Sequence, residues 1–505
     1  MRHVFRGTVG CIVVVLAALV SPALVAHTAC AQPADLPELR LSDVVTIAVR
    51  QSPDLARARL DVAAARAQLL RAQGSEDIHI GAQGKVEIVS ASRGDTSGDS
   101  ETDTLALSAS RALPTGGTLS LTATGERTKA AGFIVDSVGM VNTKIVTRYA
   151  TSLALGLVQP LLRGAGATAF EAPIRQAAQQ RDAAQLTAEA RARDVVVSLA
   201  QAYWQAAFAW RQLEIRKAAL DLAQKQLAYT EGAIRAEKVP RSEALAVQAA
   251  IAIRRQDVIA GEQEIYERSL ALRQLAGLDI GPDAIAVRTE PLPTKIDATA
   301  PAVDTAVRAA FTRSAEIAAA AATRRVAEIA AAAADNAARS RLDLDLSAGP
   351  IGAGDQPSSA LSTTFRDPGY VVTASLTADH AIGRRTERGG QQAARAALLT
   401  AQVAERDTQA RVAVRATRVV QRARAALASV DLASQAIDLA EQNVAAEQKR
   451  FELGKSTNND VLRRQDELEQ ARLRQATAVA DYLAARVELD GLSGDILARY
   501  GIVMP

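Results

Sequence analysis

Apolar side chains recur every seven residues along two long stretches of the chain. In the first stretch the repeating positions are Ala206, Leu213, Leu220, Leu227 and Ile234. In the second they are Val430, Ile437, Val444 and Phe451, with the small residues Ala433 and Ala440 between them. A heptad seam with small partners lets long helices approach each other closely. We therefore predict long helices over 170–232 and 386–453.

Capping residues, prolines and glycines divide the rest of the helical pattern into shorter pieces. Ser52 followed by Pro53 suits a helix start, and Gly277 suits a helix end. The further helices are expected over 41–74, 240–277, 302–338 and 457–494. In each half, two short helices placed end to end would match the length of the long one, which reaches roughly 95–100 Å at about 1.5 Å per residue.

Between the helices, apolar and polar residues alternate with period two. This pattern predicts strands within 78–158 and within 342–378, separated by Gly-, Ser- and Asp-rich loops at 92–103 and 348–369. Strand, long polar loop and strand are typical of a membrane β-barrel hairpin, although a soluble β layer between helices is the alternative. A turn signal at 114–117 predicts an additional hairpin in the first half. The sequence leaves open whether that hairpin joins a barrel or caps it.

The two halves of the chain are related by an internal repeat. An alignment that places Leu213 on Val430 also places Leu272 on Leu489 and Gly277 on Gly494. We interpret 32–278 and 302–494 as two copies of one unit, in which the first copy carries extra residues among its strands. A proline-rich linker, 279–301, joins them, and a short tail, 495–505, follows.

The first residues, 1–31, have the layout of a secretory signal peptide. A basic start precedes an apolar run over 11–25 and a small-x-small cleavage site that ends at Ala31. Lipoprotein-type cleavage before Cys30 is the alternative, but His27 stands where an aliphatic residue is expected. We therefore expect export and cleavage after Ala31.

Composition narrows the function classes. The chain of 505 residues is 48% hydrophobic and only 3% aromatic, with 59 Lys and Arg against 56 Asp and Glu. This composition excludes a disordered tail, a disulfide scaffold and a polytopic helical membrane protein. The near-equal numbers of basic and acidic residues argue against nucleic-acid binding. Both cysteines lie within 1–31, so the exported protein must be stabilised by packing rather than by disulfides.

The turn between the last two helices carries the most specific motif. Residues 451–462 resemble the aromatic-x-x-Gly-x(5)-Asp-Val-Leu tip of the TolC-type outer-membrane factor family, and 236–245 occupy the same register in the first half. The strand-to-helix junction at 159–164 is also similar to that of the family. The resemblance covers about residues 41–494.

This resemblance implies an α+β membrane protein in which a trimeric, twelve-stranded β-barrel in the outer membrane continues into a long α-helical barrel across the periplasm. It implies a homotrimeric, passive exit duct for a tripartite efflux pump or type I secretion system. Its partners would be a periplasmic adaptor protein, an inner-membrane transporter and outer-membrane lipid. A periplasm-spanning coiled-coil stalk or adhesin with a β-barrel anchor is the alternative.

Family members close the periplasmic entrance at the helix tips, where acidic rings bind cations. By position Glu243 and Asp460 match these acids, and Arg463, Arg241 and Lys455 are candidates to pair with them. For Asp460, capping of the following helix, with Asn458 or Asn459 at its start, is an equal alternative. The resemblance assigns adaptor docking to four tip-turn residues: Glu237, Pro240, Gly454 and Asn458. Glu237 replaces the usual glycine, which predicts a different turn geometry at the first tip.

Enzyme chemistry has no support in the sequence. Outside 1–31 the histidines are His79 and His380, and no spacing typical of a catalytic, metal or cofactor site is present. Trp204 and Trp210, with neighbouring aromatics on the first long helix, suit packing better than a substrate-binding box.

Overall fold

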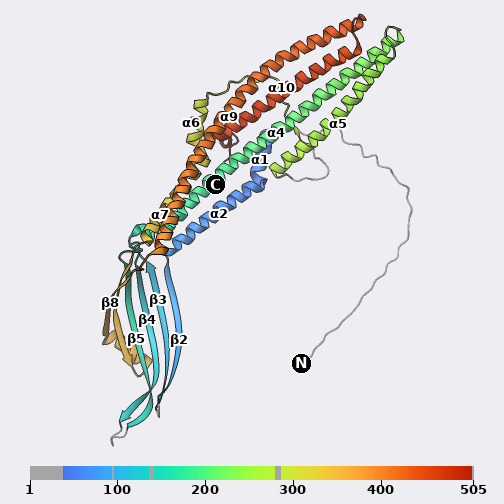
Figure 1. Cartoon of the computed structure of the whole chain (residues 1–505). Helices are drawn as coiled ribbons and strands as arrows, with labels where there is room; N and C mark the ends of the chain where they lie inside the picture. Colours follow the sequence, from blue (N-terminus) through green and yellow to red (C-terminus); the bar gives the residue numbers. More distant parts are fainter. Residues whose placement is uncertain (1–37, 94–95, 136–140, 279–285, 503–505) are drawn as a thin grey trace, which may run out of the picture.

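The protein is a long, narrow molecule in which a layer of helices continues into one antiparallel sheet (Figure 1). The computed structural model describes residues 38–93, 96–135, 141–278 and 286–502. The predicted signal peptide, its cleavage site and part of the linker lie outside the described residues. In the described part, no helix is both long enough and apolar enough to cross a membrane.

The helices of the two halves have matched lengths. The first half contains α1 (Leu41–Gln51), α2 (Pro53–Gln73), the one-turn η2 (Gly74–Glu76), α3 (Ala167–Phe170), α4 (Ala172–Arg235) and α5 (Ser242–Ala276). The second contains α6 (Val303–Arg313), α7 (Ala315–Ala337), α8 (Pro357–Arg366), α9 (Arg385–Glu452), α10 (Asn458–Leu492) and α11 (Asp495–Arg499). The helices α4 and α9 span 64 and 68 residues, whereas α5 and α10 both span 35.

Two expected helices are each broken at one serine. The helical stretches expected over 41–74 and 302–338 each contain two helices rather than one, because Ser52 and Ser314 are extended, with ψ of 122° and 116°. The helix start expected at Ser52 and Pro53 is present. Pro53 disfavours helical geometry at the residue before it. At the second break, the Ser314 side chain accepts a hydrogen bond from the Ile317 amide and so caps a new helix.

The long helices lie in one layer of four rows. Near the sheet the neighbouring rows are α2, α4, α7 and α9, and toward the tips they are α5, α4, α10 and α9. The row of α2 is thus continued by α5, and the row of α7 by α10. In each half, two shorter helices therefore stack end to end beside one long helix.

The larger sheet contains six described strands in the order β2-β3-β4-β5-β7-β8, all antiparallel. They are β2 (Ile78–Arg93), β3 (Thr96–Ala112), β4 (Thr118–Val135), β5 (Val141–Pro160), β7 (Arg341–Gly354) and β8 (Gly369–Asp379). A separate parallel pair, β1 (Glu38–Leu39) with β6 (Arg288–Thr289), joins the start of the first half to the linker.

Both polar stretches expected as loops are largely regular structure. Most of 92–103 belongs to β2 and β3, and 348–369 contain the end of β7, the helix α8 and the start of β8. The polar part of β3 is a strand because its backbone pairs with β2 along its length and with β4 over 100–112. The additional hairpin, β3 with β4, lies in line within the sheet between β2 and β5.

The sheet has one apolar and one polar face, because directly paired residues share a face. The exposed apolar face carries Ile78, Ile80, Val86, Ile88, Leu105, Leu107, Leu119, Leu121, Leu155, Leu346, Val372 and Leu376. The opposite face carries Gln83, Lys85, Ser108, Ser110, Ser120, Thr122, Thr124, Ser152, Ser347, Thr373 and Ser375. Val89, Val158, Ile351 and Val371 are exceptions on the polar face, but the overall alternation gives the two faces opposite solvent preferences.

The helix α8 packs on the apolar face. Its Thr364 hydroxyl lies 2.5 Å from that of Thr151 in β5, and its backbone passes over Gly352 in β7. A Cβ at Gly352 would lie 2.4 Å from the Thr364 amide nitrogen, so glycine is required for this contact. Leu361 and Phe365 are 53% and 66% exposed and extend the apolar surface outward.

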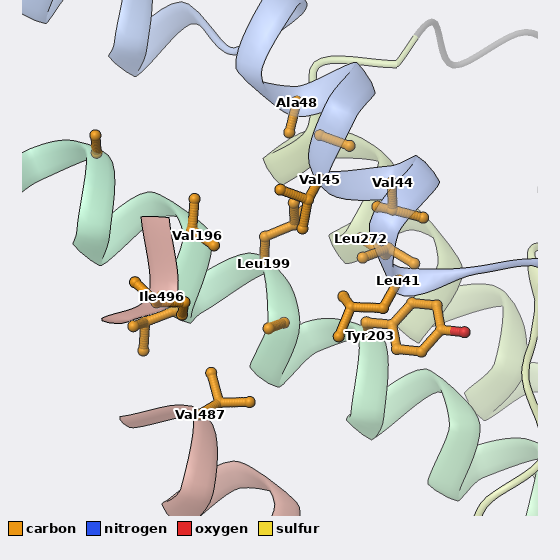
Figure 2. Packing of buried hydrophobic residues seen from close by; sticks show 14 of the residues in the cluster. Leu41, Val44, Val45, Ala48, Val196, Leu199, Tyr203, Leu272, Val487 and Ile496 are labelled. Atoms are coloured by element: carbon orange, nitrogen blue, oxygen red, sulfur yellow. The ribbon is translucent and has the colours of Figure 1, made fainter. Parts of the chain in front are cut away.

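The largest core lies where the helical layer meets α1 (Figure 2). Val44 and Val45 of α1 pack with Leu199 and Tyr203 of α4 and with Leu272 of α5. The Tyr203 hydroxyl donates to the Leu39 carbonyl at 2.9 Å and accepts from the Glu290 amide at 2.9 Å.

Trp204 and Trp210 belong to the same region of α4. Trp204 meets the ring of Tyr203 edge-on at 5.3 Å, and the Trp210 indole donates to the Val287 carbonyl at 2.9 Å. The Trp210 bond fastens α4 to the linker beside β6, so packing is the role that the structure supports for the aromatic residues.

Candidate functional site at the helix tips

The two tips have the same turn geometry. Glu237, after α4, has φ of 56°, and Gly454, after α9, has φ of 72°. In both turns the next amide reaches back to close the helix: Lys238 N–H donates to the Ala233 carbonyl at 2.9 Å, and Lys455 N–H donates to the Arg450 carbonyl at 2.8 Å. The prediction of a different geometry at the first tip is therefore wrong, since Glu237 adopts the left-handed conformation that favours glycine.

Asp460 is part of a capping box at the start of α10. The N-cap is Thr457, one residue before the expected Asn458, and its hydroxyl accepts from the Asp460 amide at 3.3 Å. The Asp460 carboxylate in return accepts from the Thr457 hydroxyl at 2.7 Å and from its amide at 3.3 Å. Two of the free amides at the helix start are satisfied in this way.

The same contacts set the charge state of Asp460. Hydrogen bonds from the Thr457 side chain and amide lower its pKa, and the nearby Arg463 guanidinium lowers it further. Arg463 donates to the Asp460 carboxylate at 2.9 Å, one turn away on the same helix. Asp460 therefore remains ionised at neutral pH while it caps α10.

Glu243 connects the first tip to the second. Its carboxylate accepts from the Asn458 backbone amide at 3.2 Å and from the Asn458 side chain at 3.0 Å. Glu243 lies in the first turn of α5, whereas Asn458 is the first residue of α10. The acid predicted to line the entrance is thus also a hydrogen-bond link between the two helical hairpins.

Asn458 is fully buried, and its amide is shared by three helices. Its side-chain oxygen accepts from Gln226 at 2.7 Å and from the Thr230 hydroxyl at 3.0 Å, both on α4. The four residues Gln226, Thr230, Glu243 and Asn458 are called the tip network below. An Asn458 side chain at zero exposure does not form part of an adaptor-docking surface in this conformation, which differs from the expectation for that residue.

Sequence reasoning missed Gln226 and Thr230. The signal that could have found them is a second buried seam on α4, in which Ala219, Ala223, Gln226 and Thr230 follow each other at helical spacing. Two polar residues within a buried stripe require hydrogen-bond partners on a neighbouring helix. Asn458 supplies that partner.

A second link between the hairpins lies further from the tips. The buried Arg254 of α5 donates to the Ala219 carbonyl at 2.7 Å and to Asp466 of α10 at 2.7 Å. It also donates to the buried Gln465 at 3.3 Å. One guanidinium therefore joins α4, α5 and α10, and sequence reasoning also missed this residue.

The remaining candidates are exposed at the tips. Glu237, Pro240 and Gly454 lie on the surface of the two turns, where a partner can contact them. Within the described residues, no ion pair connects Lys455 or Arg241 to Glu243 or Asp460. The predicted pairing with the tip acids is thus present for Arg463 alone of the three basic residues.

Comparisons with known proteins agree with this architecture. No protein-family model and no curated protein sequence matches the chain. Solved structures match over almost its whole length. The outer membrane protein VceC from Vibrio cholerae is 18% identical, with a TM-score of 0.65, over 90% of this chain and 96% of that one.

Two further structures give the same result. The CmeC outer membrane channel of Campylobacter jejuni is 13% identical, with a TM-score of 0.61, over 90% of this chain and 85% of that one. The MtrE outer membrane channel of Neisseria gonorrhoeae, in its open state, is 15% identical, with a TM-score of 0.60, over 90% and 89% of the two chains. The chain therefore has the fold of the TolC-type outer-membrane channels.

Proposed function

We propose that the protein is a passive, homotrimeric exit duct in the outer membrane of a Gram-negative-type cell. It serves a tripartite efflux pump or a type I secretion system, together with a periplasmic adaptor protein and an inner-membrane transporter. The observation that carries this proposal is the sheet with one apolar and one polar face, continued by a single layer of long helices. A wall of this kind separates lipid from water in the membrane and continues beyond it.

The apolar face is assigned to outer-membrane lipid. Toward the far hairpins it carries a charged group on β3 and β4, level with Val86 and Ile88, where Arg127 donates to Glu101 at 2.9 Å and Lys129 lies 3.3 Å from Glu101. Charged side chains on the lipid face are costly at the bilayer centre and tolerated at its interface. This group therefore marks the outer boundary of the membrane-spanning band.

The polar face is assigned to the lumen. Its central strands carry mainly Ser and Thr, such as Ser120, Thr122 and Ser152. Hydroxyls suit a water-filled interior without attracting one sign of charge. Selectivity then resides in the pump and in the tips rather than in the sheet.

The tips are assigned to gating and adaptor docking. The tip network and Arg254 fasten the α4–α5 hairpin to the α9–α10 hairpin, so the two hairpins separate only when these bonds break. Glu243 and Asp460 of three copies would form acidic rings at the entrance, and the exposed turns at Glu237, Pro240 and Gly454 would receive the adaptor. The halves 32–278 and 302–494 then act as two repeats of one duct unit.

Conductance in planar lipid bilayers tests the proposal. The purified trimer is expected to conduct ions weakly, and the double variant Glu243→Ala with Asp460→Ala is expected to conduct more or to lose cation block. A matched control is Glu452→Ala, which removes a nearby exposed carboxylate. A stable trimer that conducts in none of these forms would instead favour a structural stalk.

A further inference from the structure

We infer that the sheet closes edge to edge with two further copies of this chain into an eighteen-stranded barrel as wide as the helical tube, rather than the twelve-stranded barrel that the family resemblance implies. This inference rests on the proposed homotrimer. The interaction surfaces are the outer edges of β2 and β8.

The additional hairpin lies inside the sheet and not beside it. The helix rows run α2, α4, α7, α9, and the strands attached to them run in the same order, β2, β5, β7, β8. The hairpin of β3 and β4 is inserted between β2 and β5 and is hydrogen-bonded on both sides. It therefore widens the wall itself instead of capping it.

The strands of the sheet are staggered, which gives them a tilt. Ile78 lies at the helix-side end of β2. Direct pairing links it to one residue on each following strand, which are Arg111, Leu119, Leu157, Leu346 and finally Ala374 of β8. The helix-side end of β8 is Asp379, so the ends are staggered by about one residue per strand step. With a rise of about 3.3 Å and a strand spacing of about 4.8 Å, this gives a tilt of about 35°, which lies in the range of closed barrels.

The six-stranded sheet and the layer of four helix rows have the same width. Six strands at this tilt occupy about 35 Å of circumference, since each takes about 4.8 Å divided by the cosine of the tilt. Four helix rows at about 9 Å occupy about 36 Å. Four strands would occupy only about 23 Å. The inserted hairpin thus brings the sheet to the width of the helical layer.

The sheet has two outer edges, formed by β2 and β8. In the described sheet, β2 and β8 each pair on one side, and β8 is exposed along its whole length. Unpaired strand edges cannot face lipid, so another chain must cover them. A second copy supplies the same alternation of apolar and polar positions, which matches both faces at once.

Three copies give a barrel with a radius of about 17 Å at the Cα atoms, against about 11 Å for twelve strands of the same tilt. The tube of twelve helix rows has a radius of about 17 Å as well. The membrane part is therefore not narrower than the periplasmic part, and it admits any solute that passes the open tips.

Distances between spin labels test the strand number. Ser347 lies on the polar face of β7, and Ser347→Cys in a Cys30→Ser background places one label in each copy. For a symmetric trimer, eighteen strands predict label separations of about 29 Å, and twelve predict about 20 Å. The same label in a chain lacking 96–135, which removes β3 and β4, should give the shorter distance.

Each outcome is decisive. A separation near 29 Å in the full chain, shortened by the deletion, supports the inference. A separation near 20 Å in the full chain overturns it even if the deletion variant does not fold. A particle mass that differs from a trimer contradicts the proposed function, and so separates that failure from an error in strand number.

Discussion

Replacement of Asn458 by alanine tests how the two helical hairpins are held together. The side chain is fully buried and makes two hydrogen bonds to neutral groups, at 2.7 and 3.0 Å, and one to the Glu243 carboxylate at 3.0 Å. A neutral bond contributes about 1 kcal/mol net and a bond to a charged group about 1.5–3 kcal/mol. Asn458→Ala should therefore weaken the link between hairpins by about 3.5–5 kcal/mol, or roughly 400- to 5,000-fold in the separation equilibrium.

Amide hydrogen exchange across 226–245 measures this separation directly, since local opening governs exchange there. Exchange in this segment should accelerate by about three orders of magnitude if it proceeds through opening of the hairpins. Channel conductance in planar bilayers should rise in parallel, because the open arrangement of the tips becomes more populated.

The matched control is Asn459→Ala, which removes an exposed neighbouring amide. It should leave both readouts close to those of the unmodified protein. Equal exchange rates in the two variants would refute the role assigned to the tip network, whatever the conductance shows.

Three further predictions concern the turns and the sheet. Asp460 has a lowered pKa in the folded chain, so its cap stabilises α10 fully above the unfolded pKa of about 4. This stabilisation is lost as the pH falls through the folded pKa. The helicity of the tip should therefore decline only under acidic conditions, and less steeply in Asp460→Asn. Glu237→Gly should raise stability against denaturant by about 1 kcal/mol, and Gly454→Ala should lower it similarly, since left-handed geometry costs a non-glycine residue about that much. Gly352→Ala should lift α8 from the sheet, because its Cβ would lie 2.4 Å from the Thr364 amide nitrogen. Trypsin should then cut faster after Arg366. Unchanged cleavage would show that α8 adjusts without detaching.

Much of the helical part was predictable because its signals are local. The heptad seam through Leu213 and Leu220 specifies a long helix regardless of its partners, and the motif from Phe451 onward specifies the second tip. Prediction failed where one residue's conformation depends on its surroundings. Glu237 takes a left-handed geometry that its side chain disfavours, whereas the break at Ser52 is signalled locally by Pro53.

The sheet and the tip network show a second limit. The far part of β3 consists mostly of polar residues, and only the hydrogen bonds of β2 and β4 make it a strand. Gln226 and Asn458 are separated by 232 residues, so neither signals the other along the sequence. Contacts of this kind become visible only when the rows of helices are placed side by side.

The short parallel pair of β1 and β6 and the core around Tyr203 hold α4 at the level of the linker, and we take this level as the pivot for a rotation of α4. From Tyr203 to the end of α4 the helix extends about 48 Å at about 1.5 Å per residue. A rotation of about 10° at the pivot therefore moves the tip by roughly 8 Å over that lever. For the gate proposed at the tips, a small adjustment of packing at the level of the linker would therefore produce a large change in aperture.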